Sequence, residues 1–255
     1  MSNVLIEQHG KVLSLRLNRP DRRNAMTGDM YTALADAIQN AEKDSGIRAI
    51  CFSGEGKGFC AGNDLSDFMK SPEMSEASPV LRFLKTVSKT ELPMVAAVHG
   101  AAVGIGTTLL LHCDLVYAAP STKLALPFVN LGLVPEAGSS LLLPRIMGHV
   151  RAAELILLGD TFTPEKGVAY GLVNEIIAEE DVFTHALNIA QKLAAKPPQA
   201  LKLSRALLRR ATESEVQEAM DIEVTHFTTQ LAGPETREAF TAFFEKRKPD
   251  FSSFT

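Results

Sequence analysis

Hydrophobic and polar residues alternate along the first part of the chain and then change their period. The alternation covers residues 4–8 and 11–17 and is interrupted at His9-Gly10, which predicts a β-hairpin. From Met30 to Ala41 the apolar residues stand three or four positions apart instead, so this segment is predicted to be a helix. Thr27 precedes the helix and can cap its first turn.

The same reading predicts alternating strands and helices further along the chain. Apolar runs predict buried strands at 48–53, 94–98, 115–118, 123–126 and 172–177. Helical spacing predicts helices at 78–90, 105–112, 139–147 and 150–158, and another that begins at Thr163-Pro164. From about residue 180 onward the chain reads as helix, with breaks at 196–198 and 233–234. We therefore expect an α/β protein, with stacked ββα units in residues 1–195 and a helical region in residues 196–255.

Composition restricts the classes of partner. The 255 residues carry a net charge of −4 and no extended basic block, so we expect no nucleic-acid partner. Residues 92–113 lack Asp, Glu, Lys and Arg, but their glycines, Pro93 and His99 favour a buried strand, turn and helix over a membrane span. The three cysteines lack a metal-site spacing, and residues 1–7 lack a signal-peptide pattern. We expect a cytoplasmic protein with reduced thiols and with neither a metal nor a separate cofactor.

A short stretch of small residues, 58–65, follows the strand predicted at 48–53 and precedes a helix-like run. Ala61 and Gly62 allow a tight turn, and Asp64 can accept hydrogen bonds from nearby backbone N–H groups. Such a turn can direct the N–H of Asn63 into a cleft, where it would stabilise an oxyanion. The same residues are also compatible with a simple connection between a strand and a helix.

A second glycine turn, Gly104-Ile105-Gly106, opens the helix predicted at 105–112. The first N–H groups of a helix lack intrahelical acceptors and lie at the positive end of its dipole. The N–H of Ile105 is therefore a second candidate donor for an oxyanion hole, together with that of Asn63.

Glu136 stands in a loop of otherwise apolar and small residues, before Ala137-Gly138. Burial in this loop would raise the pKa of its carboxyl group toward that of a useful general base. Alternatively, Glu136 lies at the start of a helix, where the dipole favours an acidic side chain. Signatures of a nucleotide P-loop, a dinucleotide fold or a serine-hydrolase elbow are absent from the sequence.

These residues together resemble the crotonase (enoyl-CoA hydratase/isomerase) superfamily. Phe59-Cys60-Ala61-Gly62-Asn63-Asp64-Leu65 is similar to its first oxyanion motif, and the segment from His99 to Leu115 is similar to its second. Asn18-Arg19-Pro20, followed by Asn24-Ala25, resembles its CoA-contact loop. The resemblance implies a crotonase-like spiral of ββα units with a helical C-terminal trimerisation region.

The resemblance also implies an acyl-CoA thioester as the substrate and a homotrimer or dimer of trimers as the assembly. It assigns the oxyanion hole to the backbone N–H groups of Asn63 and Ile105. It assigns substrate and CoA contacts to the residues of the first two motifs: Ala25, Ala61, Gly62, Asn63, Asp64 and Leu65.

The sequence lacks both of the glutamates that hydratases of this family use, which bears on the reaction. The two glutamates of the hydratases fall here on Thr108 and Phe128, neither of which can act as a carboxylate acid or base. The loop around Glu136 instead resembles that of peroxisomal-type 3,2-enoyl-CoA isomerases, which carry one catalytic Glu there. We therefore expect an isomerase in fatty acid oxidation, with Glu136 as proton shuttle. A hydratase, another crotonase reaction and a non-catalytic acyl-CoA-binding protein remain alternatives.

Further expectations concern the acyl pocket and the CoA contacts. Apolar residues are expected to line the acyl pocket, although core packing explains them equally well: Phe68, Met69, Phe128 and Leu133. Arg22, Arg23 and Lys57 either meet CoA phosphates or are solvated. The segment 243–248 resembles one that approaches the CoA adenine.

Overall fold

The computed structural model describes residues 2–68 and 78–254. Its larger sheet has six strands in the order β1-β2-β3-β5-β7-β9. Their bounds are β1 (Val4–His9), β2 (Val12–Leu17), β3 (Ala49–Gly54), β5 (Met94–Val98), β7 (Leu115–Ala118) and β9 (Glu175–Ile176). β1 and β2 form the predicted antiparallel hairpin, and the remaining pairs are parallel.

A second, three-stranded parallel sheet has the order β4-β6-β8. It consists of β4 (Gly58–Cys60), β6 (Ala101–Val103) and β8 (Lys123–Ala125). β4 and β6 were expected to be loop and turn. Three-residue strands of small residues are too short to show an alternation of apolar and polar positions. Their partner strands lie some 20 to 40 residues away in the chain, so neighbouring residues do not predict them. Three successive turns of the chain, β3–β4, β5–β6 and β7–β8, thus each contribute one strand to each sheet, whereas β1, β2 and β9 belong to the larger sheet alone.

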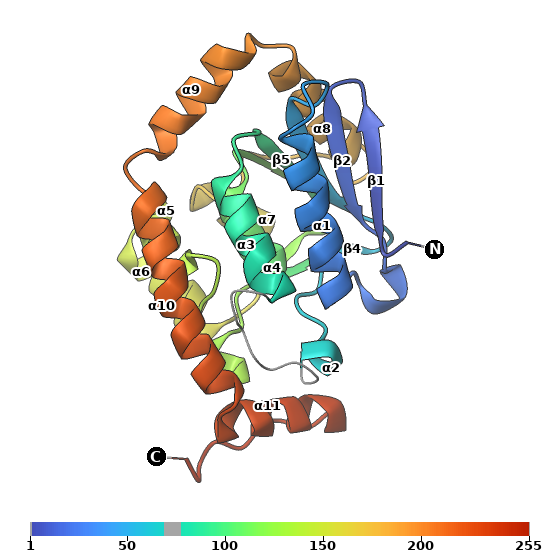
Figure 1. Ribbon diagram of the computed structural model, residues 1–255. Coiled ribbons are helices and arrows are strands. Elements are labelled where there is room, and N and C mark those ends of the chain that lie inside the picture. The colour runs from blue at the N-terminus through green and yellow to red at the C-terminus, as the bar shows by residue number, and fades with distance from the viewer. Residues whose placement is uncertain (1, 69–77, 255) are drawn as a thin grey trace.

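Helices connect and cover the sheets (Figure 1). In chain order they are α1 (Gly28–Ala41), α2 (Leu65–Phe68), α3 (Pro79–Lys89), α4 (Ile105–Thr108), α5 (Ser139–Met147), α6 (His149–Ala153), α7 (Pro164–Ala169), α8 (Val182–Ala194), α9 (Pro198–Arg209), α10 (Glu213–Leu231) and α11 (Pro234–Glu245). Four other turns are η1 (Pro20–Arg22), η2 (Leu109–His112), η3 (Val129–Leu131) and η4 (Glu154–Leu158). The predicted caps at Thr27 and Thr163 are confirmed, since each side chain accepts a hydrogen bond from a first-turn N–H.

Three predicted elements differ in detail. The helix expected at 105–112 is α for one turn and then 3₁₀. The helix expected at 150–158 becomes a π-helix from Glu154. The strand expected at 172–177 is reduced to β9, because only Glu175 and Ile176 pair with β7.

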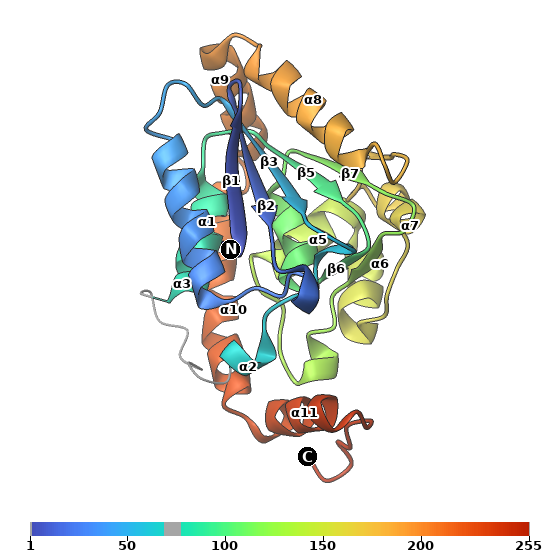
Figure 2. The same cartoon turned by 90° about the vertical axis from the view of Figure 1, so that its right-hand side faces the viewer.

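Both faces of the central sheet are covered, which explains why its strands read as continuous apolar runs. Along β3, Ile50 and Phe52 face the main core, whereas Ala49 and Cys51 face a smaller cluster formed with α8. In Figure 2, α8 crosses the strands on one side, while α1 and α3 lie on the other. The small residues on the α8 side allow that helix to approach the sheet closely.

Residues 196–255 contain α9, α10 and α11, which form the periphery of the molecule (Figure 1). α10 packs against α3 and α5, and α11 packs against η3. The division into a spiral core and a separate helical region stays a prediction. In the part of the chain that is described, no helix has the length and apolar character needed to cross a bilayer.

Candidate active site

All eight residues predicted for the site line one pocket of about 590 Å³. They come from the loop between β2 and α1 (the 20s loop, residues 18–27), the turn after β4, the start of α4 and the loop before α5. The eight residues are Ala25, Ala61, Gly62, Asn63, Asp64, Leu65, Ile105 and Glu136. The structure therefore brings together segments that are more than 100 residues apart in the chain.

The first glycine turn is held by Met26. The N–H of Met26 donates to the carbonyl oxygen of Gly62 at 2.8 Å, and its own carbonyl accepts from the N–H of Asp64 at 2.9 Å. Because successive N–H groups of an extended chain point to opposite sides, the N–H of Asn63 is directed away from Met26. Within residues 2–68 and 78–254, no backbone hydrogen bond from this N–H is found.

The second glycine turn leaves the N–H of Ile105 available. Gly104 has a φ of +54° and precedes the first residue of α4. Its carbonyl oxygen accepts from the N–H groups of both Thr107 and Thr108, at 2.8 and 2.9 Å. Ile105 occupies the first helical position, where an N–H has no intrahelical acceptor.

The two turns are packed directly against each other. A Cβ atom on Gly106 would lie 2.5 Å from the carbonyl oxygen of Cys60, and one on Gly62 would lie 3.2 Å from that of Val103. Only glycine fits at Gly106 without displacing the backbone. The parallel pairing of Cys60 with Ala102 fixes the same approach. Close packing therefore places the two candidate donors on one wall of the pocket.

Asp64 ties the 20s loop to the first turn. Arg19 donates through Nη1 to Asp64 at 2.7 Å and to the carbonyl oxygen of Ala25 at 3.0 Å. Partial burial raises the pKa of Asp64, but hydrogen bonds from Ser66 and Arg19 outweigh it and lower the pKa to about 2. Asp64 is thus a charged structural anchor that holds Ala25 beside Asn63.

Glu136 is buried at the pocket wall, with only 3% of its surface exposed. Neither carboxylate oxygen has a hydrogen-bond partner among the described residues. Burial raises the pKa of Glu136 to about 8, and the nearby charge of Glu223 acts in the same direction. Glu136 is therefore buried, as the first interpretation expected, and it precedes Gly138, the N-cap of α5, so it does not lie in the first helical turn.

The loop that carries Glu136 is held from two sides. His112 donates through Nε2 to the carbonyl oxygen of Ala137 at 2.8 Å. Glu223 on α10 accepts from the N–H groups of Gly138 and Ser140 at 2.6 and 2.8 Å. Ala137 has a φ of +63°, in the left-handed region that an L-residue occupies at a cost of about 1–2 kcal/mol. These contacts maintain a strained turn, and His112 is a buried histidine that is hydrogen-bonded to it.

Two residues that support the predicted site, Tyr31 and Glu223, were missed by the sequence reading. The phenol of Tyr31 on α1 donates a hydrogen bond to Oδ1 of Asn63. Burial raises the pKa of Tyr31 well above its usual value, and the charge of Glu136 adds to this. Glu223 could have been found from the sequence, because it is an acidic residue at helical spacing within the apolar stripe of Val216, Met220 and Phe227 on α10.

The apolar part of the pocket contains Phe128 and Leu133, as expected, and also Phe227 and Phe240 from α10 and α11. Met69 and the side chain of Phe68 lie outside the described part of the chain. Thr108 is buried, and its hydroxyl has no partner among the described residues.

The pocket mouth includes Arg22, Arg23, Phe243 and Phe244. Of the predicted cations, Lys57 does not occur among the described residues that line the pocket. Arg247 is engaged by Glu238 and Glu245 at 2.5 and 2.7 Å. Over the described ranges, no group of three or more His, Cys, Asp and Glu side chains is arranged to hold a metal ion.

Comparison with known proteins gives concordant matches. A profile of the family described as "Enoyl-CoA hydratase/isomerase" matches residues 7–253. The 1,2-epoxyphenylacetyl-CoA isomerase of Escherichia coli (strain K12) is 33% identical, over 99% of this chain and 99% of that protein. Enoyl-CoA delta isomerase 2 of Rattus norvegicus is 34% identical, over 96% of this chain and 64% of that protein. A crystal structure of an enoyl-CoA hydratase/isomerase from Pseudoalteromonas atlantica T6c has a TM-score of 0.95 and 41% identity, covering 98% of this chain and 100% of that chain. Further similar proteins carry hydratase names.

Proposed function

Because the chain belongs to the enoyl-CoA hydratase/isomerase family, we propose that it is a 3,2-enoyl-CoA isomerase that acts on unsaturated acyl-CoA in fatty acid oxidation. The observation that carries the proposal is Glu136, a buried carboxyl group with a raised pKa and unpaired oxygens in the pocket. It is a single acid–base group, and moving a double bond from C3 to C2 requires only one.

In the proposed reaction, the carboxylate of Glu136 removes a proton from C2 of a 3-enoyl-CoA. The electron pair of the broken C–H bond delocalises into a dienolate, with negative charge on the thioester oxygen. The protonated Glu136 then returns the proton to C4, and the double bond lies between C2 and C3. The carboxylate is regenerated, so the cycle consumes neither water nor a cofactor.

The N–H groups of Asn63 and Ile105 are proposed to hold the thioester oxygen. Both donors are backbone groups fixed by packed turns, so they are oriented before charge develops. Preorganised donors of this kind are worth about two to three orders of magnitude in rate each. The dienolate would thus be stabilised within reach of the acid that protonates it.

Hydration is less well supported by the residues present. It must deprotonate water and protonate the α-carbon, which favours two carboxylates. At the positions where hydratases carry them, this chain has Thr108 and Phe128, and Phe128 is part of the apolar wall. The relatives include proteins named as hydratases, so the reaction itself must be measured.

The pocket suggests how the substrate is oriented. The apolar end, with Leu133 and Phe227, would receive the acyl chain, and the mouth with Arg22 and Arg23 would face the CoA phosphates. We also propose the trimeric assembly usual for crotonases. Exposed leucines on α9 are compatible with such a contact: Leu203, Leu207 and Leu208.

The deciding experiment offers the purified protein a 3-enoyl-CoA and a 2-enoyl-CoA in separate assays. The proposal predicts conversion of the first substrate and little hydration of the second. The Glu136→Gln variant should lose nearly all isomerase activity while it still binds the CoA ester. Glu180→Gln, at an exposed position, is the matched control and should retain activity.

Three results would contradict the proposal. Isomerase activity retained by Glu136→Gln would remove Glu136 from the mechanism. Efficient hydration of the 2-enoyl-CoA would identify a hydratase. Binding without turnover of either substrate would identify a non-catalytic acyl-CoA-binding protein.

A further inference from the structure

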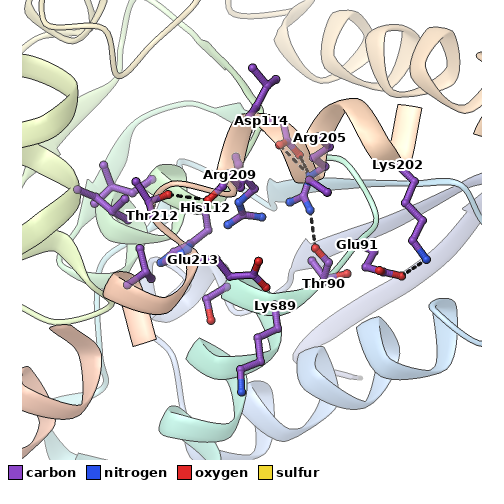
Figure 3. Close-up of a pocket in the computed structure, with 17 residues that line it drawn as sticks. Lys89, Thr90, Glu91, His112, Asp114, Lys202, Arg205, Arg209, Thr212 and Glu213 are labelled. Carbon is purple, nitrogen blue, oxygen red and sulfur yellow. Dashed lines mark hydrogen bonds and ion pairs between the residues drawn. The ribbon is translucent and has the colours of Figure 1, made fainter. Parts of the chain in front are cut away.

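A second pocket, of about 280 Å³, lies beneath α9 (Figure 3). Its walls are α9, the start of α10 and two core segments, 88–91 and 111–114. It shares no lining residue with the pocket that contains Glu136. The acyl-CoA chemistry proposed above therefore leaves this second pocket unexplained.

Arg205 brings a buried positive charge to the second pocket. Its Nε donates to both carboxylate oxygens of Asp114 at 2.8 Å, and its Nη1 donates to the carbonyl oxygen of Thr90. Its Nη2 is buried and has no partner in the described part of the chain. The residue is only 8% exposed, and leaving a buried donor unpaired costs about 1–3 kcal/mol. A ligand oxygen would satisfy this group.

Arg209 lies one helical turn after Arg205 and also lines the pocket. It is partly buried, yet no hydrogen bond or ion pair joins its guanidinium to any described residue. Burial lowers its pKa and the like charge of Arg205 adds to this effect, whereas the carboxylates of Asp114 and Glu213 oppose it. In Figure 3 the side chains of Arg205, Arg209 and His112 gather in the centre of the pocket.

The charges of the pocket do not cancel. Arg205 is paired with Asp114, and Lys202 is paired with Glu91. The remaining lining charges are exposed Lys89, exposed Glu213 and partly buried Arg209. Two positive groups therefore face one negative group. The more buried positive group, Arg209, interacts with Glu213 and Asp114 only at longer range, without a hydrogen bond or ion pair among the described residues.

His112 determines which oxyanion fits. Its Nε2 faces the carbonyl oxygen of Ala137, which can only accept, so Nε2 carries the proton. Its Nδ1 is then a lone pair, buried and without a donor among the described residues. The imidazole is neutral, because burial lowers the pKa of His112 to about 4, assisted by Arg209 and Arg205 and despite the bond to Ala137. A ligand with both an anionic oxygen and a hydroxyl group matches the guanidinium donors and this acceptor.

We propose that the pocket beneath α9 binds a phosphate group that retains a hydroxyl, held by Arg205 and Arg209 with its O–H directed to Nδ1 of His112. The source is either inorganic phosphate or a small phosphate monoester. Guanidinium groups bind phosphate oxygens in pairs with charge-assisted hydrogen bonds. Leu203 and Leu207 do not line the pocket, whereas Leu208 does, so a contact made through Leu203 and Leu207 alone does not use the lining residues.

The test is calorimetric titration of the 255-residue protein with inorganic phosphate, sulfate and methyl phosphate at constant ionic strength and about pH 5. This pH is below the second pKa of a phosphate monoester, about 6, so methyl phosphate also keeps one O–H. Phosphate should bind saturably, and sulfate, which carries no hydroxyl at this pH, should bind at least several-fold more weakly. Arg209→Gln should weaken phosphate binding about tenfold or more, the loss expected for one charge-assisted hydrogen bond. Arg210→Gln, the adjacent exposed arginine, is the matched control and should bind like the original protein.

The methyl phosphate titration identifies the source of the ligand. Binding as tight as that of phosphate assigns the site to a monoester, and much weaker binding assigns it to the free ion; either supports the proposal. Absence of saturable binding, or equal binding by Arg209→Gln, would overturn it. Equal binding of sulfate would remove the hydroxyl requirement and the role of His112. Dissociation of an oligomer by Arg209→Gln, without phosphate binding to the original protein, would assign the arginine to an acidic side chain of a second copy.

Discussion

The carboxylate of Glu223 accepts a hydrogen bond from the N–H of Gly138 at 2.6 Å, two residues after Glu136. Through this contact a side chain on α10 holds the backbone turn that presents the buried acid. Glu223 is itself buried, and its charge is the second cause, after burial, of the raised pKa of Glu136. One residue therefore acts on both the position and the proton affinity of the proposed catalytic group.

The first prediction concerns Glu223→Gln. The change removes a negative charge near Glu136, so the acid limb of the pH profile of kcat/KM should move to lower pH. An amide oxygen can replace only one of the two accepted hydrogen bonds, so the free energy of unfolding should fall by about 1.5–3 kcal/mol. Kinetic pH profiles and chemical denaturation test both effects.

Glu218→Gln on the exposed side of α10 is the control for this change and should alter neither quantity. A purely structural role for Glu223 would be indicated if stability fell while the acid limb stayed in place.

The second prediction is the pH dependence of the original enzyme. Glu136 must be ionised to accept a proton, and its pKa in the free enzyme is about 8. The value of kcat/KM should therefore rise through neutral pH and level off above about pH 8. Below that pH, kcat/KM should fall about tenfold per unit, because the carboxylate fraction does so. A profile with its acid limb near the ordinary pKa of a glutamate would contradict the assignment.

The third prediction concerns Tyr31→Phe. The substitution keeps the ring in the core but removes the O–H that donates to Oδ1 of Asn63. Asn63 would then be less firmly oriented at the proposed oxyanion hole, and kcat should fall about tenfold, equivalent to about 1.4 kcal/mol. Tyr170→Phe is the control, because it loses a hydrogen bond to Glu154 outside the pocket. Steady-state kinetics in which both variants behave alike would exclude this role for Tyr31.

The fourth prediction concerns Gly106→Ala. The added methyl group would lie 2.5 Å from the carbonyl oxygen of Cys60, so the two glycine turns would have to separate. We expect a loss of about 1–3 kcal/mol in the free energy of unfolding, as for other overpacked sites, together with a fall in kcat.

Gly28→Ala provides the comparison for this variant, because its methyl group would meet nothing closer than 3.7 Å. Thermal denaturation and kinetics on the two variants distinguish a local clash from the general effect of replacing a helical glycine by alanine, which by itself favours the helix by up to about 1 kcal/mol. Equal stability of the two would contradict the close packing of the turns.

Much of the architecture follows from local patterns. The β1–β2 hairpin, α1 with its Thr27 cap and the apolar strand β5 were predicted correctly, because alternation, helical spacing and capping are properties of neighbouring residues. The likeness to solved structures confirms the crotonase fold. β4 and β6 were missed, since three small residues become a strand only when a distant partner pairs with them.

The sequence alone identified the short segments to which the chemistry is assigned: the turn at 61–65, the turn at Gly104 and the loop of Glu136. Each is a local departure from the surrounding pattern, so it can be read without its neighbours in space. Only the tertiary structure decided that these segments share one pocket and that Glu136 is desolvated there. It alone supplied Tyr31 and Glu223 as their supports, because burial and long-range contacts depend on how distant parts of the chain pack.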